Sequence, residues 1–223
     1  MKKRILVIIL IVLVSGFVIF GVNTARKCII IKSLQNKVAE CEAKENIYTK
    51  VVGESAEVEK FIKNDIEKIV MKKKDNAVTI IQVTEQHERR FYTIVGEQKI
   101  LRRFKEEKNP MSSKVVSFVN TTTWLETLRD SVVSKIYTEK VDGYECYVID
   151  SMKNTNAIYS EGAISLKMYL DKETGLAVKT IETIKNEDGT IEDSVTTYEQ
   201  KIDVVTDEDM KEPDREEFII EEN

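Results

Sequence analysis

The stretch Met168-Tyr-Leu-Asp-Lys-Glu-Thr-Gly-Leu-Ala-Val-Lys-Thr-Ile181 decides the fold class of this chain, because it has the form of two strands joined by a tight turn. Apolar residues flank the polar Asp-Lys-Glu-Thr-Gly segment on both sides, as in paired strands that bury one face. Gly175 can adopt the positive φ that this reversal needs at no steric cost. The stretch therefore predicts an antiparallel β-hairpin.

Turn signals of the same kind recur between residues 64 and 97. They follow one another every 10 or 11 residues, with apolar and β-branched runs between them, which is typical of a meander of antiparallel strands. Residues 58–70 also fit a helical period, but the turn signal in their middle favours two strands. The four signals are Asn64-Asp65, Asp75-Asn76, Gln86-His87 and Gly96-Glu97.

Hairpin turns are also predicted later in the chain by Asp142-Gly143, Glu173-Thr-Gly175 and Asp188-Gly189. Pro110 and the polar segment 152–162 mark loops. The strands are expected at residues 135–141, 144–150, 163–170, 176–185 and 190–203.

Two amphipathic helices are predicted beside these strands. The first carries Ile31, Leu34, Val38 and Cys41 at spacings of 3, 4 and 3, which places them on one face for packing against a sheet. This helix can also continue the apolar segment before it. The second begins at Thr123-Trp-Leu-Glu126, which matches a capping box. Its apolar face is formed by Trp124, Leu125, Leu128 and Val132.

An apolar run of 18 residues, Ile5 to Val22, follows the basic N-terminus Met1-Lys-Lys-Arg4. As a helix it spans roughly 27 Å, close to the hydrocarbon thickness of a bilayer. We expect an uncleaved anchor in the plasma membrane, a cytoplasmic N-terminus and an extracytoplasmic C-terminal domain. The alternative is a removed signal peptide, but no convincing pair of small residues marks a cleavage site after Val22.

The charge balance argues against nucleic-acid binding. The chain has 34 Lys+Arg and 39 Asp+Glu, a formal net charge of -5, with acidic residues concentrated near the C-terminus. Short basic clusters at 72–74, 89–90 and 102–103 do not make the strongly basic stripe that phosphate backbones require. The acidic C-terminus is expected to be a solvated, loosely held strand or tail.

Cysteine usage predicts a fold held by its core. Three cysteines in 223 residues do not make a disulfide scaffold. Cys28 and Cys41 on one helix would lie about 20 Å apart, too far for a bridge. A disulfide between Cys41 and Cys146 is geometrically possible. The alternative is that both are small buried apolar residues.

The residue types for catalysis are sparse. His87, the single histidine, belongs to a charged turn, so no histidine-based metal site can form. The 8 glycines are scattered over turns and the apolar segment and make no phosphate loop. We therefore expect a non-enzymatic protein without metal or cofactor.

The order helix, meander, short helix and paired strands carries a family resemblance. Together with the segments Val141-Asp-Gly-Tyr-Glu-Cys-Tyr-Val-Ile149, Met168 to Lys179 and Val205-Thr-Asp-Glu-Asp-Met-Lys-Glu-Pro213, it resembles the LolA-like superfamily of envelope lipoprotein carriers and RseB-like relatives. The chain departs from the family at Ala177, where members often have a proline, and lacks a match for the functional arginine of the carriers.

This resemblance implies a mainly β fold of the α+β class, a curved antiparallel half-barrel sheet covered by helices. The transmembrane helix predicted from the apolar run precedes it. It also implies an apolar cavity for the acyl chain of a lipid or lipoprotein. Trp124, Leu125, Leu128 and Val132 are the candidate ligand-binding residues, on a helix that acts as a lid; the alternative is that they are packed core. For function, the alternative is a cell-envelope sensor or protein-interaction module with a filled core.

The expected domain organisation follows from these boundaries. Residues 1–4 are cytoplasmic, 5–22 form the anchor and 23–33 the juxtamembrane start of a helix. Residues 34–217 form the β domain and 218–223 the acidic tail. The expected partners are the membrane and a lipid or lipoprotein ligand, and not a nucleic acid.

Overall fold

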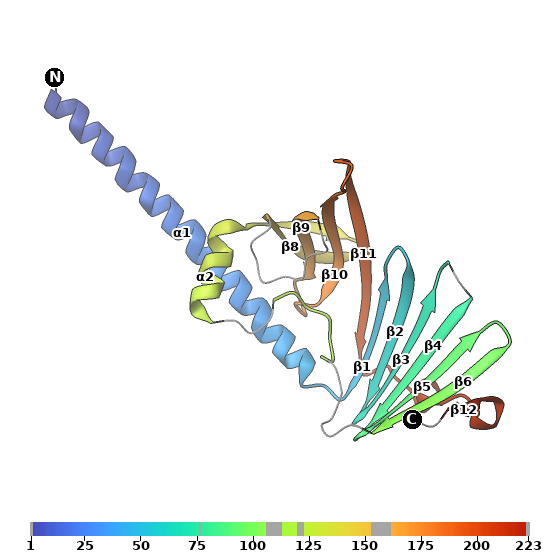
Figure 1. The fold of residues 1–223 in the computed structure, drawn as a ribbon. Coiled ribbons are helices and arrows are strands. Elements are labelled where there is room, and N and C mark those ends of the chain that lie inside the picture. The colour runs from blue at the N-terminus through green and yellow to red at the C-terminus, as the bar shows by residue number, and fades with distance from the viewer. Residues whose placement is uncertain (1, 76, 106–112, 120–122, 153–161, 222–223) are drawn as a thin grey trace.

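The computed structural model describes residues 2–75, 77–105, 113–119, 123–152 and 162–221, with side chains from Val18 onward. Within these ranges it has twelve strands in one curved, open sheet (Figure 1), in the order β12-β6-β5-β4-β3-β2-β1-β11-β10-β9-β8-β7. Neighbouring strands are antiparallel except β12 and β6. The mainly β fold predicted from the sequence is confirmed.

The strand bounds are β1 (Asn46–Val52), β2 (Ala56–Lys63), β3 (Ile66–Lys73), β4 (Val78–Glu85), β5 (Glu88–Val95), β6 (Gln98–Lys105), β7 (Lys135–Val141), β8 (Tyr144–Met152), β9 (Ala163–Asp171), β10 (Ala177–Lys185), β11 (Ile191–Ile202) and β12 (Ile219–Glu221). The helices are α1 (Lys2–Glu42), α2 (Trp124–Val133) and α3 (Asp207–Met210), with a 3-10 turn η1 (Arg215–Glu217).

The meander predicted from the end of the first helix to about Phe104 is confirmed: β1 to β6 lie next to one another in the sheet in chain order. At the ambiguous segment, Asn64 has a φ of 55° in the turn between β2 and β3, so the two-strand interpretation is correct. Asp142 and Gly143 also have positive φ, as their hairpin requires. The loop predicted around Pro110 and most of the loop predicted at 152–162 lie outside the described residues.

The turn between β9 and β10 is organised by Asp171. Its carboxylate accepts hydrogen bonds from the backbone N–H of Thr174 at 3.1 Å and from the Thr174 hydroxyl at 2.7 Å. Gly175 has the expected positive φ, 75°. The Asp-Lys-Glu-Thr-Gly segment thus satisfies its own polar groups within the turn.

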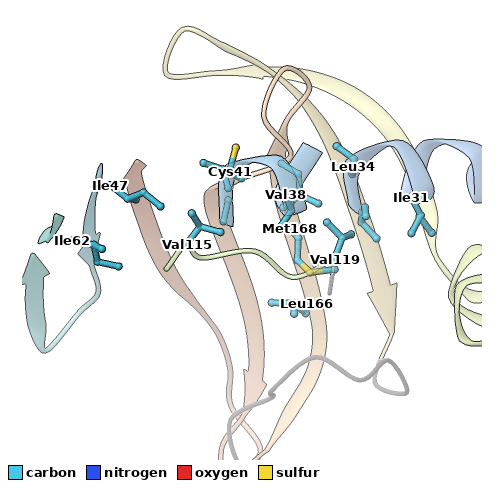
Figure 2. Packing of buried hydrophobic residues seen from close by; sticks show 14 residues of the cluster. Ile31, Leu34, Val38, Cys41, Ile47, Ile62, Val115, Val119, Leu166 and Met168 are labelled. Carbon is cyan, nitrogen blue, oxygen red and sulfur yellow. The ribbon is translucent and has the colours of Figure 1, made fainter. Parts of the chain in front are cut away.

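The predicted apolar face of α1 packs on the sheet. Figure 2 shows Ile31, Leu34, Val38 and Cys41 of α1 in one cluster with residues of the strands and of the segment 113–119. All four are buried, so the period of 3, 4 and 3 was a reliable signal. The strand partners in this cluster include Ile47, Ile62, Ile149, Leu166 and Met168.

The helix α1 also contains the expected anchor. Residues 5–17 of that segment lie outside the described side chains. Along the part of the chain that the structure describes, no helix combines the length and hydropathy that crossing a membrane requires. The anchor therefore stays a prediction.

The opposite face of the sheet has a separate apolar cluster, in which Val83, Tyr92 and Leu101 pack with Phe218. The C-terminal segment crosses this face, and its last strand, β12, pairs with β6 through Ile219 and Ile100. Of the two forms expected for the acidic C-terminus, the strand is correct for residues 219–221, which are exposed to solvent but paired with β6. The acidic tail expected at 218–223 is corrected in this respect, because the buried ring of Phe218 and the β12 pairing hold residues 218–221. Residues 222–223 lie outside the described part.

All three cysteines are free thiols. Cys41 packs in the cluster beneath α1, whereas Cys146 packs with Val148 and Tyr169 in a different cluster. Strand alternation puts Cys146 on the face of β8 opposite to Ile149, which contacts the α1 cluster. The interpretation of both cysteines as buried apolar residues is therefore correct.

Candidate functional site

The sheet face that carries α1, called the α1 face below, is covered unevenly by the described residues. The α1 cluster reaches from β8 to β1 and ends at Ile62 of β2. Beyond Ile62, the register continues on the same face through Glu67 and Thr84, which are not part of that apolar cluster. On β3 to β6 the α1 face therefore carries no described residue of the apolar cluster that packs under α1.

One row of side chains crosses this surface. The strand register aligns one residue from each of β1 to β6, and this set is called the apolar row. The row lies on the α1 face because its residue in β2, Val58, is four positions from Ile62. Residues an even number of positions apart in a strand point to the same face of the sheet. The apolar row consists of Val51, Val58, Met71, Ile80, Thr93 and Ile100, all half-buried.

The two ends of the apolar row are also apolar. Val51 is aligned with Tyr198 of β11, whose ring packs edge-on against Phe118 with centroids 6.0 Å apart. Ile100 is aligned with Ile219 of β12, which is 69% exposed. Five strand spacings make the row about 24 Å long. It is a long apolar strip, open to solvent along part of its width.

A buried ion pair lies beside the apolar row. Lys60 Nζ is 3.0 Å from Glu67 Oε1, and the Glu67 side chain is 1% exposed. The Lys60 ammonium also donates a hydrogen bond to the Ser113 carbonyl oxygen. Because the two charges are opposite and in contact, the ion pair adds no net charge to the surface beside the apolar row.

The helix α2 is built as the sequence predicts. The Thr123 hydroxyl accepts from the Glu126 N–H, and the Glu126 side chain accepts from the Thr123 N–H, which completes the capping box. The helix packs on α1: the Cys28 Sγ and Ser131 Oγ atoms are 3.0 Å apart. Lys27 Nζ donates to the Ser134 carbonyl oxygen at 2.7 Å, at the α2 C-terminus.

The predicted ligand residues lie together on α2, but they face outward. Trp124 is 71% exposed, Leu125 72% and Val132 44%, while Leu128 is half-buried. The side chains that α2 buries are Thr127 and Ser131, because small polar groups allow its close approach to α1. The core alternative is therefore wrong for Trp124, Leu125 and Val132, and the lid role stays a prediction.

Three cavities can be placed among the described residues, and α2 lines none of these three. One of about 290 Å³ lies between α1 and β7–β8, one of about 270 Å³ is lined by Lys50 and Tyr144 among others, and one of about 460 Å³ surrounds His87. His87 is exposed in the β4–β5 turn. In the part of the chain that is described, no cluster of three His, Cys, Asp or Glu side chains is placed to hold a metal ion.

Known proteins were compared with this chain. No protein-family model matches it, and no curated protein matches its sequence. Among solved structures, an uncharacterized conserved protein from Thermus thermophilus is 11% identical, with 85% of this chain and 98% of that chain covered and a TM-score of 0.47. MucB is 13% identical over 83% of this chain and 63% of its own, with a TM-score of 0.37.

A LolA superfamily protein from Nitrosomonas europaea is also matched. It is 10% identical over 82% of this chain and 98% of its own, with a TM-score of 0.26. LolA-like proteins are thus among the structures that this chain resembles, as the sequence resemblance predicted.

Sequence reasoning did not find the apolar row. Each strand shows the alternation of apolar and polar residues, but alternation leaves open which residues of neighbouring strands are aligned. Met71 and Ile80 are nine residues apart in the sequence and become direct neighbours through the β3–β4 pairing. The row could be found only from the register of the five strand pairs from β1 to β6, which decides which residues lie side by side.

Proposed function

We propose that this chain is a membrane-anchored, extracytoplasmic, non-enzymatic protein that binds an acyl chain of a lipid or lipoprotein along the apolar row. The supporting observation is the row itself, in which five apolar side chains and Thr93 form one half-buried strip across β1 to β6. A soluble protein seldom leaves a continuous apolar strip without a partner.

The chemistry of the strip fits an uncharged, elongated ligand. Burial of apolar ligand surface contributes about 25 cal/mol per Å², so an acyl chain is retained by area without any charged contact. The ion pair Lys60–Glu67 next to the row is internally neutralised, which avoids an uncompensated charge beside the ligand. Met71 adds an adaptable side chain at the middle of the row.

Membrane attachment is the second part of the proposal. Its support is the apolar run from Ile5 to Val22, which is long enough as a helix to cross the hydrocarbon core. With residues 1–4 in the cytoplasm, the β domain lies on the other side of the membrane, next to the lipids and lipoproteins of the outer leaflet.

A protein-interaction or sensor module is the second candidate function. The interior beneath residues 34–41 of α1 favours it, since this part of the fold is filled. Leu34 and Ile47 are 1% exposed, and Ile62 and Leu170 are 0% exposed. A filled interior has no room for a ligand inside the fold. In this case the apolar row contacts an apolar segment of a partner protein instead of a lipid.

The test is lipid release from the full chain, purified from bacterial membranes in a mild detergent and extracted with organic solvent. Near-stoichiometric lipid in the wild-type extract is expected. Met71→Asp is expected to remove this lipid with the circular dichroism spectrum unchanged, because a carboxylate in contact with the acyl chain is costly to desolvate. Mass spectrometry of the same preparation reports whether the N-terminal segment is still attached.

Ile191→Asp is the matched control. Ile191 is 64% exposed at the β10–β11 hairpin and does not belong to the apolar row, so this variant keeps the lipid. Lipid that stays bound in Met71→Asp would rule out the row as the binding surface. A folded wild-type chain that releases no lipid would favour the protein-interaction function.

A further inference from the structure

The outward surface of α2 is unusually apolar for a short helix in a folded domain. Four of its ten residues are large, apolar and exposed, and they are called the α2 patch. They are Trp124 at 71%, Leu125 at 72%, Val132 at 44% and Val133 at 48%. An exposed apolar cluster of this kind marks a surface that contacts another apolar phase.

The α2 patch lies close to the end of the apolar run of α1. Lys27 and Cys28 of α1 contact Ser134 and Ser131, at the C-terminal end of α2. Lys27 is five residues beyond Val22, which is about 7.5 Å along a helix. Val22 is itself 65% exposed. The helix α2 therefore lies beside α1 just beyond the apolar run (Figure 1).

Basic and tyrosine side chains gather at the same level. The cavity of about 290 Å³ between α1 and β7–β8 is lined by Arg26 and Lys27, by Tyr137 and Tyr147, and by four further residues, none of them acidic. Arginine and lysine side chains near a bilayer surface attract anionic lipid phosphates. Tyrosine and tryptophan favour the boundary between hydrocarbon and water. The charges beside the patch thus complement a phospholipid surface.

We infer that α2 lies in the headgroup region of the membrane that holds α1, with the α2 patch in contact with lipid and with Arg26 and Lys27 at lipid phosphates. This inference rests on the proposed membrane anchor and is independent of the apolar row. The indole of Trp124 suits this position because its rings contact lipid while its N–H stays in the polar layer. The helix then fixes the height and orientation of the β domain above the bilayer.

A second copy of the chain is a poorer occupant of the patch. A stable dimer buries at least about 1,000 Å² in total, and one face of a helix of ten residues supplies only part of this area. A symmetric dimer through the patch would also bring Arg26 and Lys27 of both copies into one interface, where like charges oppose association.

Trp124 is the only tryptophan of the chain, so its fluorescence reports directly on the patch. The full chain is reconstituted into vesicles of phosphatidylglycerol and phosphatidylcholine, with bromine atoms near the headgroup end of the acyl chains. Brominated lipid is expected to quench at least half of the Trp124 emission, and aqueous iodide to quench little of it. In a variant that combines Trp124→Phe with Ile191→Trp, the indole lies at a distant hairpin, and iodide but not brominated lipid is expected to quench it.

The charge part of the inference has its own variant. Replacing both Arg26→Gln and Lys27→Gln is expected to reduce quenching by brominated lipid at least twofold in vesicles rich in phosphatidylglycerol, and to leave it unchanged in pure phosphatidylcholine. Equal quenching by the wild type and this variant in both vesicle types would refute the role of the two cations.

The outcomes separate this inference from the proposed function. A wild-type chain that floats with the vesicles while iodide quenches Trp124 as strongly as the Ile191→Trp indole would overturn the position of α2 and leave the anchor intact. A chain that does not float with vesicles would overturn the anchor and the inference together. Shielding from both quenchers, with cross-linked dimers, would assign the patch to a second copy and also reject the inference.

Discussion

Gly175 lies directly against the backbone of α1 at Leu34. A Cβ atom added to Gly175 would stand 2.8 Å from the Leu34 carbonyl oxygen and 3.0 Å from the Val38 Cγ2 atom. Gly175 therefore meets two requirements, the positive φ of the turn and the close approach of the turn to the helix. This contact sets how closely α1 approaches β9 and β10.

Gly175→Ala should lower the free energy of unfolding by about 2 kcal/mol or more, because it adds both backbone strain and a steric clash. Gly189→Ala is the control: Gly189 has a similar φ of 86°, but nothing lies within 4 Å of its added Cβ atom. It should lose only the strain, about 1 kcal/mol. Urea unfolding at one protein concentration measures both, and equal losses would show that the contact with Leu34 is unimportant.

Glu67→Gln should destabilise the fold by about 3 kcal/mol, because it removes the negative charge that faces the Lys60 ammonium in a buried setting. Glu57→Gln removes one partner of the Lys50–Glu57 pair, which is 2.9 Å apart but has both side chains 29% exposed. The loss in Glu57→Gln should be much smaller than the loss in Glu67→Gln, because solvent screens an exposed pair. Thermal unfolding of both variants compares the pairs, and similar shifts would contradict the assigned difference in burial.

The C-terminal segment should detach in acid. Burial acts to raise the pKa of Glu212, but the hydrogen bond from Tyr92 and the nearby Arg90 guanidinium outweigh it, and the net pKa is lowered. A lowered carboxylate pKa stabilises the fold above the ordinary glutamate value of 4.5, and this contribution is lost as the pH falls below that value. The protection of residues 204–221 against hydrogen exchange, taken relative to the intrinsic exchange rate at each pH, should fall over this window.

The variant Glu212→Gln tests whether Glu212 causes the acid sensitivity of the C-terminal segment. The variant has no carboxylate to protonate, so the protection of the C-terminal segment should be lower at neutral pH and should change less between about pH 5 and pH 3. An unaltered acid dependence in Glu212→Gln would assign the effect to other carboxylates of the segment, such as Asp209, whose pKa is also lowered by hydrogen bonds from Thr206.

The buried thiols should resist alkylation in the folded chain. Burial raises the pKa of Cys146 to about 11, and the pKa of Cys41 is raised by the same cause. Little thiolate is therefore present at about pH 8, and thiolate is the reactive form. Maleimide should modify both residues only after denaturation, and urea unfolding should be the same with and without reductant. Loss of structure on reduction would reveal a disulfide.

Leu128→Asp tests the predicted lid role of α2. Leu128 is the half-buried member of the predicted ligand residues, so a carboxylate there meets any acyl chain held beneath the helix. If α2 is a lid, the variant loses bound lipid and keeps its fold. Loss of the fold instead would show that Leu128 packs in the domain, and retention of both lipid and fold would show that α2 does not close the binding site.

The sequence by itself determined which segments are strands and helices and where most turns lie. The turn at Asn64, the capping box of Thr123 and Glu126, and the buried face of α1 depend on residues within a few positions of one another, which is why periodicity and turn chemistry predict them. The pairing of the C-terminal residues with β6 was not predicted, because Ile219 and Ile100 are far apart in the chain.

Only the tertiary structure decided the candidate surfaces. The apolar row arises from the register of five strand pairs, and a shift by one residue would turn its side chains to the opposite face. The orientation of α2 arises from its contact with α1, where Ser131 meets Cys28 and the apolar residues Trp124 and Leu125 are left outside. A helical period shows that residues share a face; what that face touches depends on elements that lie far away in the sequence.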